Sequence, residues 1–211
     1  MAEFTLVIGD KNTSSWSLRP WLLMREAQIG FDEVSIRLRQ PDTRQQCLAH
    51  SPSGKVPVLK HNGQLIWDTL AIAEYLAELF PEKQLWPTDH ADRARARSIS
   101  AEMHSGFQPL RTHLSMDMLG SHPGVGHSSE GVAQDVARVQ EIWRDCRAQA
   151  TTGPFLFGAF SIADAMYAPV VSRFRTYGVA CDSVCRAYME AIWSLTAMQS
   201  WIAAARQQQS A

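Results

Sequence analysis

The sequence predicts a small α/β domain followed by an all-α domain, and three observations support this fold class. Strand and helix patterns alternate over residues 1–80, residues 81–90 hold two prolines without periodicity, and residues 91–211 show only helical patterns. The 211 residues are enough for two small domains, and the hydrophobic content of 45% is ordinary for a globular chain. We therefore expect one domain on each side of a linker at 81–90.

The N-terminal elements begin with a strand, a helix and a second strand. Residues 4–8 are strand formers, and apolar residues recur with a helical period over 18–29. Ser17 is the expected N-cap, which would place Pro20 in the first turn, where its missing N–H costs nothing. Alternating apolar and polar side chains predict the second strand at 34–38.

The rest of this domain is predicted to contain a short helix, a β-hairpin and a final helix. A loop with room for the short helix precedes strands at 56–59 and 65–67. Asn62-Gly63 lies between these strands, and Asn-Gly is the strongest short hairpin signal. Helical spacing then covers 72–79 and ends at Pro81. The predicted order is β-α-β-α-β-β-α.

The C-terminal domain is predicted to be entirely helical. Two long helices are expected at 91–119 and 129–150, with a glycine-rich loop between them. Ser161 and Asp164 have the spacing of a capping box at the start of another helix. Weaker helical patterns continue to Arg206, and the last five residues are expected to form a frayed tail.

Composition argues against several functional classes. The formal net charge is −1, whereas nucleic-acid-binding proteins usually carry a basic excess. No apolar run approaches the ~18 residues of a membrane span, and the N-terminus lacks the basic segment of a signal peptide. The four cysteines show no CxxC spacing, and His122 and His127 lack a third metal ligand. We expect a cytoplasmic protein that binds no nucleic acid, membrane or metal.

Three short segments of the N-terminal domain contain residues suited to chemistry. The serines of 13–20 lie at a helix start, where they could cap the helix or donate a hydrogen bond to an anion. Pro57 at the start of a strand is unusual, and a cis Val56–Pro57 bond would turn the Val56 N–H and C=O outward. Asp68 and Thr69 precede the last helix of this domain, where they could cap it or hold the charged end of an amino acid.

The combination of these segments with the predicted element order resembles the cytosolic glutathione transferase superfamily over nearly the whole chain. Ser14-Ser15-Trp16-Ser17-Leu18-Arg19 looks like the Ser-Ser-x-Ser-x-Arg motif of the zeta class, and residues 51–59 are similar to the loop and cis-proline of the superfamily. Asp68-Thr69 takes the place of the usual Glu/Gln-Ser pair. Phe107-Gln108-Pro109-Leu110 resembles the zeta-class Ile-Gln-Pro-Leu segment. The resemblance implies a thioredoxin-like N-terminal domain that binds glutathione.

The resemblance also implies roles for individual residues. Ser14, five residues before Arg19, is the better candidate for the hydroxyl that faces the glutathione sulfur, and Ser15 is the alternative. Asp68 and Thr69 would hold the γ-glutamyl end of glutathione. The glutathione-binding residues that the resemblance implies are Lys55, Val56, Asp68, Thr69 and Gln108.

The electrophile site of this superfamily lies between the two domains. The candidates here are Trp16, His104, Phe107 and Arg111. The last three are spaced at i, i+3 and i+7, so they would share one face of a continuous helix, where packing at a domain interface is the alternative role. Arg111 suggests an anionic substrate.

We therefore expect a glutathione transferase that activates the glutathione thiolate for attack on a small electrophile, and the family resemblance implies a homodimer. Glutathione-dependent isomerisation, as in maleylacetoacetate isomerases, and peroxide reduction are alternatives that need the same thiolate. Trp16 stands where zeta-class isomerases commonly carry a cysteine, which argues against the isomerase. A catalytically silent binding module with this fold is the third alternative.

Overall fold

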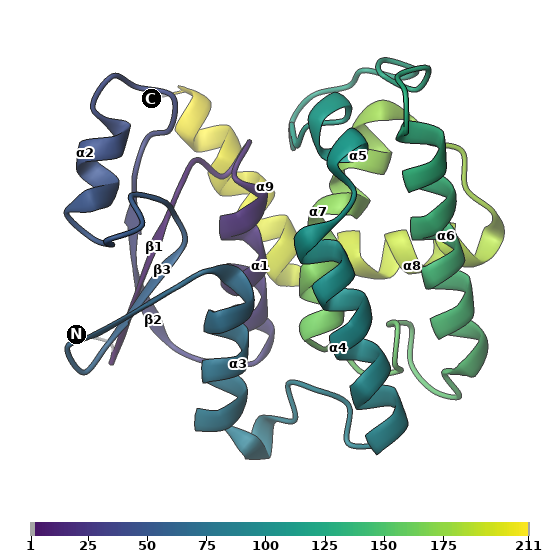
Figure 1. Ribbon diagram of the computed structural model, residues 1–211, viewed down its shortest axis with the longest axis horizontal. Coiled ribbons are helices and arrows are strands. Elements are labelled where there is room, and N and C mark those ends of the chain that lie inside the picture. The colour runs from purple at the N-terminus through teal and green to yellow at the C-terminus, as the bar shows by residue number, and fades with distance from the viewer. Residues whose placement is uncertain (1–2, 211) are drawn as a thin grey trace.

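The computed structural model describes residues 3–210, and its first half is a mixed four-stranded sheet with helices packed against it (Figure 1). The strands lie in the order β2-β1-β3-β4, with β2 parallel and β3 antiparallel to β1. This arrangement confirms the predicted β-α-β-α-β-β-α order and the thioredoxin-like fold. The elements are β1 (Phe4–Ile8), α1 (Ser15–Glu26), β2 (Phe31–Ser35), α2 (Thr43–Leu48), β3 (Val58–His61), β4 (Gln64–Trp67) and α3 (Thr69–Leu79).

Helix α1 begins earlier than the sequence predicts. Ser14, not Ser17, is the N-cap residue, and Pro20 lies inside the helix. The Ser17 hydroxyl instead accepts a hydrogen bond from the Gly9 N–H at 3.0 Å, so it is not free to cap. Because Pro20 has no N–H, the helix leaves the Trp16 carbonyl without its usual partner four residues later. The prediction of Pro20 in the first turn was therefore wrong.

Strand β2 also differs from its predicted position. The alternation that suggested 34–38 is real, since Ile36 is buried while its neighbours are not. The parallel pairing with β1, however, runs from Phe4 opposite Phe31 to Ile8 opposite Ser35. Pairing with the neighbouring strand determines these limits, and the pattern within one strand does not contain that information.

The second half of the structure is entirely helical and packs beside the sheet domain (Figure 1). Helix α9 returns to lie along α1, and the Gln208 side chain accepts a hydrogen bond from the Lys11 N–H at 2.9 Å. The predicted frayed tail is therefore helical as far as Ser210. The elements are the 3₁₀ turn η1 (Pro81–Lys83), α4 (His90–Ser105), α5 (Gln108–His113), α6 (Val132–Gln149), α7 (Ile162–Tyr177), α8 (Ser183–Trp193) and α9 (Thr196–Ser210).

The single helix predicted at 91–119 is broken at Gly106. Helix α4 ends there, Phe107 takes a left-handed backbone conformation with φ of 60°, and Pro109 is the second residue of the short helix α5. A Cβ atom on residue 106 would lie 2.9 Å from the Glu102 carbonyl oxygen, so glycine suits this tight turn. The Arg111 side chain folds back and donates to the Gly106 carbonyl at 2.9 Å, which satisfies an acceptor at the end of α4.

The hydrophobic core runs without interruption from the sheet domain into the helical half. One cluster of buried side chains includes Leu6 of β1, Leu22 of α1 and Tyr167 of α7. Helix α7 lies at its centre and starts at the predicted capping box, in which Ser161 and Asp164 cap each other's backbone. Within residues 3–210, the helices are too short or too polar to cross a membrane.

Candidate active site

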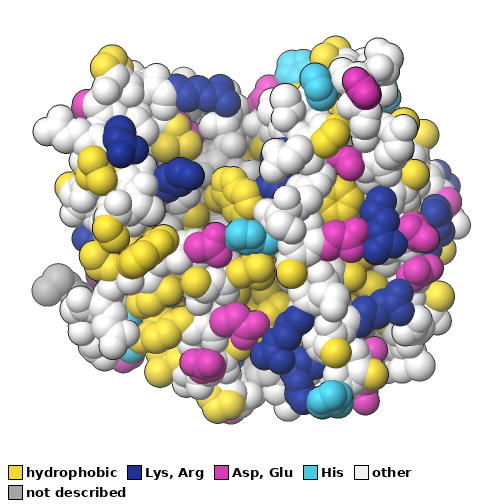
Figure 2. Space-filling view, in the orientation of Figure 1, with side chains coloured by type: hydrophobic (Ala, Val, Ile, Leu, Met, Phe, Trp, Pro, Cys, Tyr) yellow, Lys and Arg dark blue, Asp and Glu magenta, His cyan; other side chains and the backbone are white. Residues whose placement is uncertain are grey.

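A cleft of about 460 Å³ opens where the ends of β3 and β4 face helix α4. The surface is notched between the sheet domain and the helical half in this region (Figure 2). Four of the five residues predicted to bind glutathione line this cleft. The lining residues are Trp16, Ser53, Lys55, Val56, Pro57, Trp67, Asp68, Thr69 and His104.

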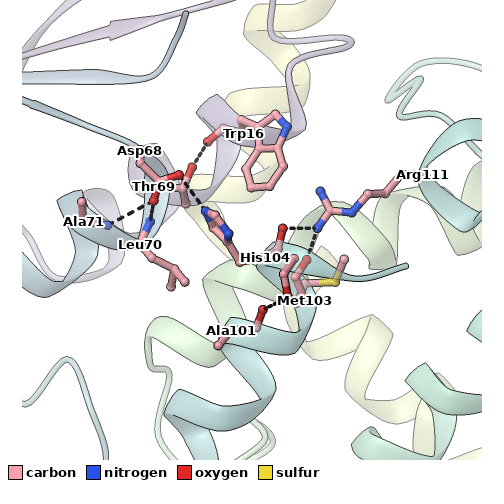
Figure 3. A network of polar contacts seen from close by, with 10 residues as sticks. Trp16, Asp68, Thr69, Leu70, Ala71, Ala101, Met103, His104 and Arg111 are labelled. Carbon is pink, nitrogen blue, oxygen red and sulfur yellow. Dashed lines mark hydrogen bonds and ion pairs between the residues drawn. The ribbon is translucent and has the colours of Figure 1, made fainter. Parts of the chain in front are cut away.

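Asp68 joins the two halves of the molecule across this cleft (Figure 3). One carboxylate oxygen caps α3 by accepting from the backbone N–H groups of Leu70 and Ala71 at 2.9 and 3.3 Å. The other lies 2.6 Å from Nε2 of His104 on α4. The predicted cap is therefore present, and the carboxylate also faces the cleft with a histidine beside it.

The loop before β3 forms the opposite wall of the cleft. The Val56–Pro57 peptide bond is cis, and the β3 ladder begins only at Val58. Ser53 shapes the preceding turn by accepting the Lys55 N–H at 3.2 Å on its hydroxyl. Val56 is half-buried and lies against the cleft, with its peptide groups outside the sheet.

Thr69 does not use its hydroxyl in the cleft. The hydroxyl donates to the Trp16 carbonyl at 3.0 Å, the group that Pro20 leaves without a helical partner. This bond ties the first turn of α1 to the start of α3. A role of Thr69 in binding would therefore fall to its backbone N–H at the start of α3.

A second cavity of about 340 Å³ lies on another side of Trp16. It contains Gln108, which was predicted to contact glutathione but does not line the first cleft, and Arg111. Among the described residues, Trp16 is the one that lines both cavities, so the two cavities lie next to each other. The lining residues are Thr13, Ser15, Trp16, Arg39, Gln108, Arg111, Ser115, Met116 and Arg173.

Two arginine side chains contact the indole of Trp16. The guanidinium carbons of Arg19 and Arg111 lie 4.5 and 4.6 Å from its ring centroid, within the range of cation–π attraction. The His104 ring meets the indole edge-on at 5.2 Å. In Figure 3, the Arg111 guanidinium lies beside the indole and donates back to carbonyls of α4. These contacts hold the indole in its position.

The predicted electrophile residues do not form one stripe, because the helix break separates them. His104 lies in the first cleft beside Asp68. Phe107 is only 7% exposed, packs in the core and lines neither cavity. Arg111 lines the second cavity.

The two candidate hydroxyls occupy different surroundings. Ser14 lines neither cavity, and its hydroxyl donates to that of Ser17 at 2.8 Å. Ser15 lines the second cavity, and its oxygen accepts a hydrogen bond from Nη2 of Arg173 at 3.3 Å.

Arg19, Arg111 and Arg173 form a cluster of positive charge beside Trp16, in which Arg19 and Arg173 are buried and Arg111 is half-buried. Burial lowers the pKa of each guanidinium, and repulsion from Arg111 lowers the pKa of Arg19 and Arg173 further, the latter to about 10. One nitrogen of Arg19 is buried without a hydrogen-bond partner among the described residues. Such a cluster favours an anion in the adjoining cavity.

Several lining residues were not predicted from the sequence. Ser53 and Trp67 adjoin motif residues, and their positions beside Lys55 and Asp68 could have suggested them. Arg39 and Arg173 carry no such signal, because only the fold brings them to the cavity. Among residues 3–210, no group of three histidine, cysteine or acidic side chains is placed to hold a metal ion.

Comparison with known proteins agrees with this architecture. The glutathione S-transferase N-terminal domain family matches residues 13–79 and the corresponding C-terminal domain family matches residues 129–191, together more than half of the chain. Maleylacetoacetate isomerase from rat is 29% identical over 80% of this chain and 77% of its own length, and that from Pseudomonas aeruginosa is 28% identical over 82% of each. A probable maleylacetoacetate isomerase from Caenorhabditis elegans is 32% identical, but the match spans only half of either protein.

Solved structures show the same fold. A glutathione transferase homologue from Burkholderia, determined with bound glutathione, aligns with a TM-score of 0.73 over 97% of this chain and 98% of its own, at 22% identity. A tau-class glutathione S-transferase from mango aligns with a TM-score of 0.74 over 99% and 97%, at 17% identity. The two domain families, in the expected order on the expected fold, show that this chain belongs to the glutathione S-transferase family of enzymes.

Proposed function

We propose that this protein binds glutathione in the cleft between the Val56–Pro57 segment and Asp68, and that it presents the thiolate to a small electrophile in the cavity beyond Trp16. The observation that carries the proposal is the meeting of three recognition groups in one cleft. These are the Val56 backbone, whose peptide groups lie outside the sheet, the Asp68 carboxylate and the N-terminus of α3. Together they suit an extended peptide that begins with an amino-acid zwitterion.

The chain offers no reactive thiol of its own at this site. Burial raises the pKa of all four cysteines, and none of them lines either cavity. The nucleophile would therefore be the thiol of glutathione, whose ordinary pKa of about 8.5 leaves only a few per cent ionised at neutral pH. The N-terminus of α1 and the arginine cluster favour the anion, which then attacks the electrophile.

Binding of reduced glutathione by isothermal titration calorimetry tests the first half of the proposal. Asp68→Asn is the sharpest variant, because an amide oxygen can still cap α3 while the negative charge is lost. Loss of a charge-assisted hydrogen bond should weaken binding by roughly 10- to 100-fold. Asp89→Asn is the matched control, since Asp89 caps α4 in the same way outside the cleft and should leave the affinity unchanged.

The outcomes of this titration separate the proposed functions. The site would be supported if the wild type binds glutathione, Asp68→Asn weakens this binding and Asp89→Asn leaves it unchanged. Absence of binding to the wild type would refute the proposal. Binding without turnover of any electrophile or peroxide in a substrate panel would instead support a catalytically silent binding module.

A glutathione-dependent isomerase is the second candidate. Rat and Pseudomonas maleylacetoacetate isomerases are among the relatives, and the arginine cluster suits a substrate that carries carboxylates. Trp16 opposes this reading, because it replaces the usual cysteine with a large fixed side chain. An isomerisation assay distinguishes the two activities. The assay uses the ultraviolet spectrum of maleylacetoacetate to monitor its isomerisation by the protein, with and without glutathione.

We further propose a cytoplasmic homodimer. Leu65 and Trp67 point to one face of the edge strand β4 and are 42% and 46% exposed, and Leu79 of α3 is 40% exposed. A second copy of the chain would cover these side chains. Light scattering should give twice the monomer mass for the wild type and the monomer mass for Leu65→Glu. Val125→Glu, at an exposed position of the helical half, should stay dimeric.

A further inference from the structure

His104 and Asp68 meet across the cleft, although they come from different halves of the molecule. His104 lies near the end of α4, and its side chain points toward Asp68, the N-cap residue of α3 (Figure 3). Nε2 of His104 lies 2.6 Å from Oδ2 of Asp68, and both residues line the cleft. Because an ionised carboxylate only accepts hydrogen bonds, Nε2 carries the hydrogen of this pair.

The hydrogen bonds of the Asp68 carboxylate leave one place for a ligand. An ionised carboxylate has about four acceptor sites, two on each oxygen. Oδ1 already accepts from the N–H groups of Leu70 and Ala71 at 2.9 and 3.3 Å. Oδ2 accepts from His104, so a ligand ammonium would take the second acceptor site of this same oxygen. The ammonium and the imidazole would then lie roughly 4–5 Å apart, given ordinary hydrogen-bond lengths.

This shared oxygen makes the charge of His104 matter to the ligand. Histidine is the side chain that commonly changes its charge between pH 5 and 8. A neutral His104 can donate its Nε2–H to Asp68 and still leave the carboxylate as a counter-ion for an ammonium. A protonated His104 neutralises Asp68 itself and places a second cation beside the ammonium, and like charges at this distance repel each other.

The other charges around His104 add to this repulsion. Arg19 of α1 and Arg111 of α5 both flank the indole that His104 contacts edge-on, and Arg111 also donates to the His104 carbonyl at 3.2 Å. Lys55 lines the same cleft from the loop before β3. Among the described residues that line the cleft, Asp68 is the only carboxylate and His104 the only histidine. One counter-ion would therefore serve both the imidazolium and the ligand ammonium.

We propose that His104 is a positioning residue that makes glutathione binding depend on pH, because its protonated form and the ligand ammonium compete for Asp68. This inference rests on the proposed glutathione binding and deepens it. When glutathione binds to the protonated form, the His104 ring releases one proton to water, and its Nε2–H keeps the hydrogen bond to Asp68. The affinity should therefore rise from pH 5.5 to 7.5. A rise of about 3- to 10-fold is expected, because both side chains are partly exposed and water screens the repulsion.

Isothermal titration calorimetry with S-methylglutathione at pH 5.5 and 7.5 tests this competition, since this ligand keeps the ammonium and has no ionisable thiol. His104→Gln keeps an N–H that can donate to Asp68, and it carries no charge at either pH. This variant should match the affinity of the wild type at pH 7.5 and exceed it by about 3- to 10-fold at pH 5.5. A purely structural role of His104 would instead lower the affinity of the variant equally at both pH values.

Two controls locate the effect at the ammonium. The analogue of S-methylglutathione in which hydrogen replaces the α-amino group has no cation to compete with His104, so its affinity for the wild type should not rise with pH. His122→Gln removes a histidine that pairs with Asp117 at 2.9 Å and lines neither cavity. This variant should keep the pH dependence of the wild type.

Each result has a distinct meaning. If the wild type binds S-methylglutathione at neither pH, the proposed function fails. If it binds equally at both, or if His104→Gln keeps the rise in affinity with pH, the inference is overturned while the proposed site stands. Circular dichroism shows whether His104→Gln folds. If it does not, the two ligands still decide with the wild type: a rise for S-methylglutathione alone supports the competition, and an equal rise for both ligands refutes it.

Discussion

The bond between Thr69 and Trp16 should stabilise the protein only because Pro20 lies inside α1. Thr69 is 2% exposed, and its hydroxyl donates to the Trp16 carbonyl at 3.0 Å. Thr69→Val keeps the shape of the side chain and removes the donor. A carbonyl left without a partner in this partly buried position costs about 1–3 kcal/mol, so we expect a loss of about that size in the free energy of unfolding.

The same substitution should cost much less when the helix can supply its own donor. Pro20→Ala restores an N–H four residues after Trp16, where a regular α-helix would place it. In that background Thr69→Val leaves the carbonyl bonded. A double-mutant cycle should therefore give a coupling free energy of about 1–2 kcal/mol between the two positions.

Urea unfolding of the four proteins, followed by circular dichroism, measures this coupling. The comparison requires that the free energy of unfolding falls with urea concentration at the same slope in all four proteins, because an equal slope shows that the extent of unfolding is the same. Thr69→Ser is the control and should remain close to wild type, since it keeps the hydroxyl. An equal cost of Thr69→Val with and without Pro20 would refute the explanation, because the bond would then not compensate for the missing N–H.

Two further predictions concern the helical half. Burial raises the pKa of Asp164 from its ordinary 3.8 to about 6, so the folded state favours the protonated acid and stability should fall as pH rises from about 4 to 6, by about 2 kcal/mol. Urea unfolding at both ends of this range should show that fall in the wild type and not in Asp164→Asn; the same fall in both would exclude Asp164 as its source. Arg111→Met should lower the free energy of unfolding by about 1–3 kcal/mol, because carbonyls at the end of α4 lose their donors. Thermal denaturation of Arg111→Met and of Arg138→Met, a control at an exposed position, measures the loss of stability in each variant. An equal loss in the two variants would contradict the prediction.

Local signals in the sequence account for much of the fold. The hairpin around Asn62-Gly63, the cap at Asp68 and the capping box of Ser161 and Asp164 all involve residues within a few positions of each other. Each motif satisfies backbone groups locally, so its type and spacing predict the turn or helix end. The cleft residues Lys55, Val56 and Asp68 follow from these motifs and from the family resemblance.

The features that the sequence did not predict depend on contacts between distant segments. Apolar spacing continues through Gly106, so the break between α4 and α5 is not visible in the periodicity. Arg173 lies in a helix of mostly buried residues, and its bond to Ser15 spans 158 positions. The choice between Ser14 and Ser15 likewise depends on which partner each hydroxyl meets in the folded chain.

The uninterrupted core has a consequence for how this protein can open and unfold. Helix α1 packs on α7 and α9 as well as on α3, so the two sides of the cleft share one hydrophobic core. A hinge between the halves would have to expose apolar side chains of α1 to water. The cleft already opens at the surface, so a ligand can enter without such a hinge, and heat should unfold both halves in a single cooperative transition. A fragment that ends at residue 80 would expose the buried face of α1 and should aggregate when expressed alone.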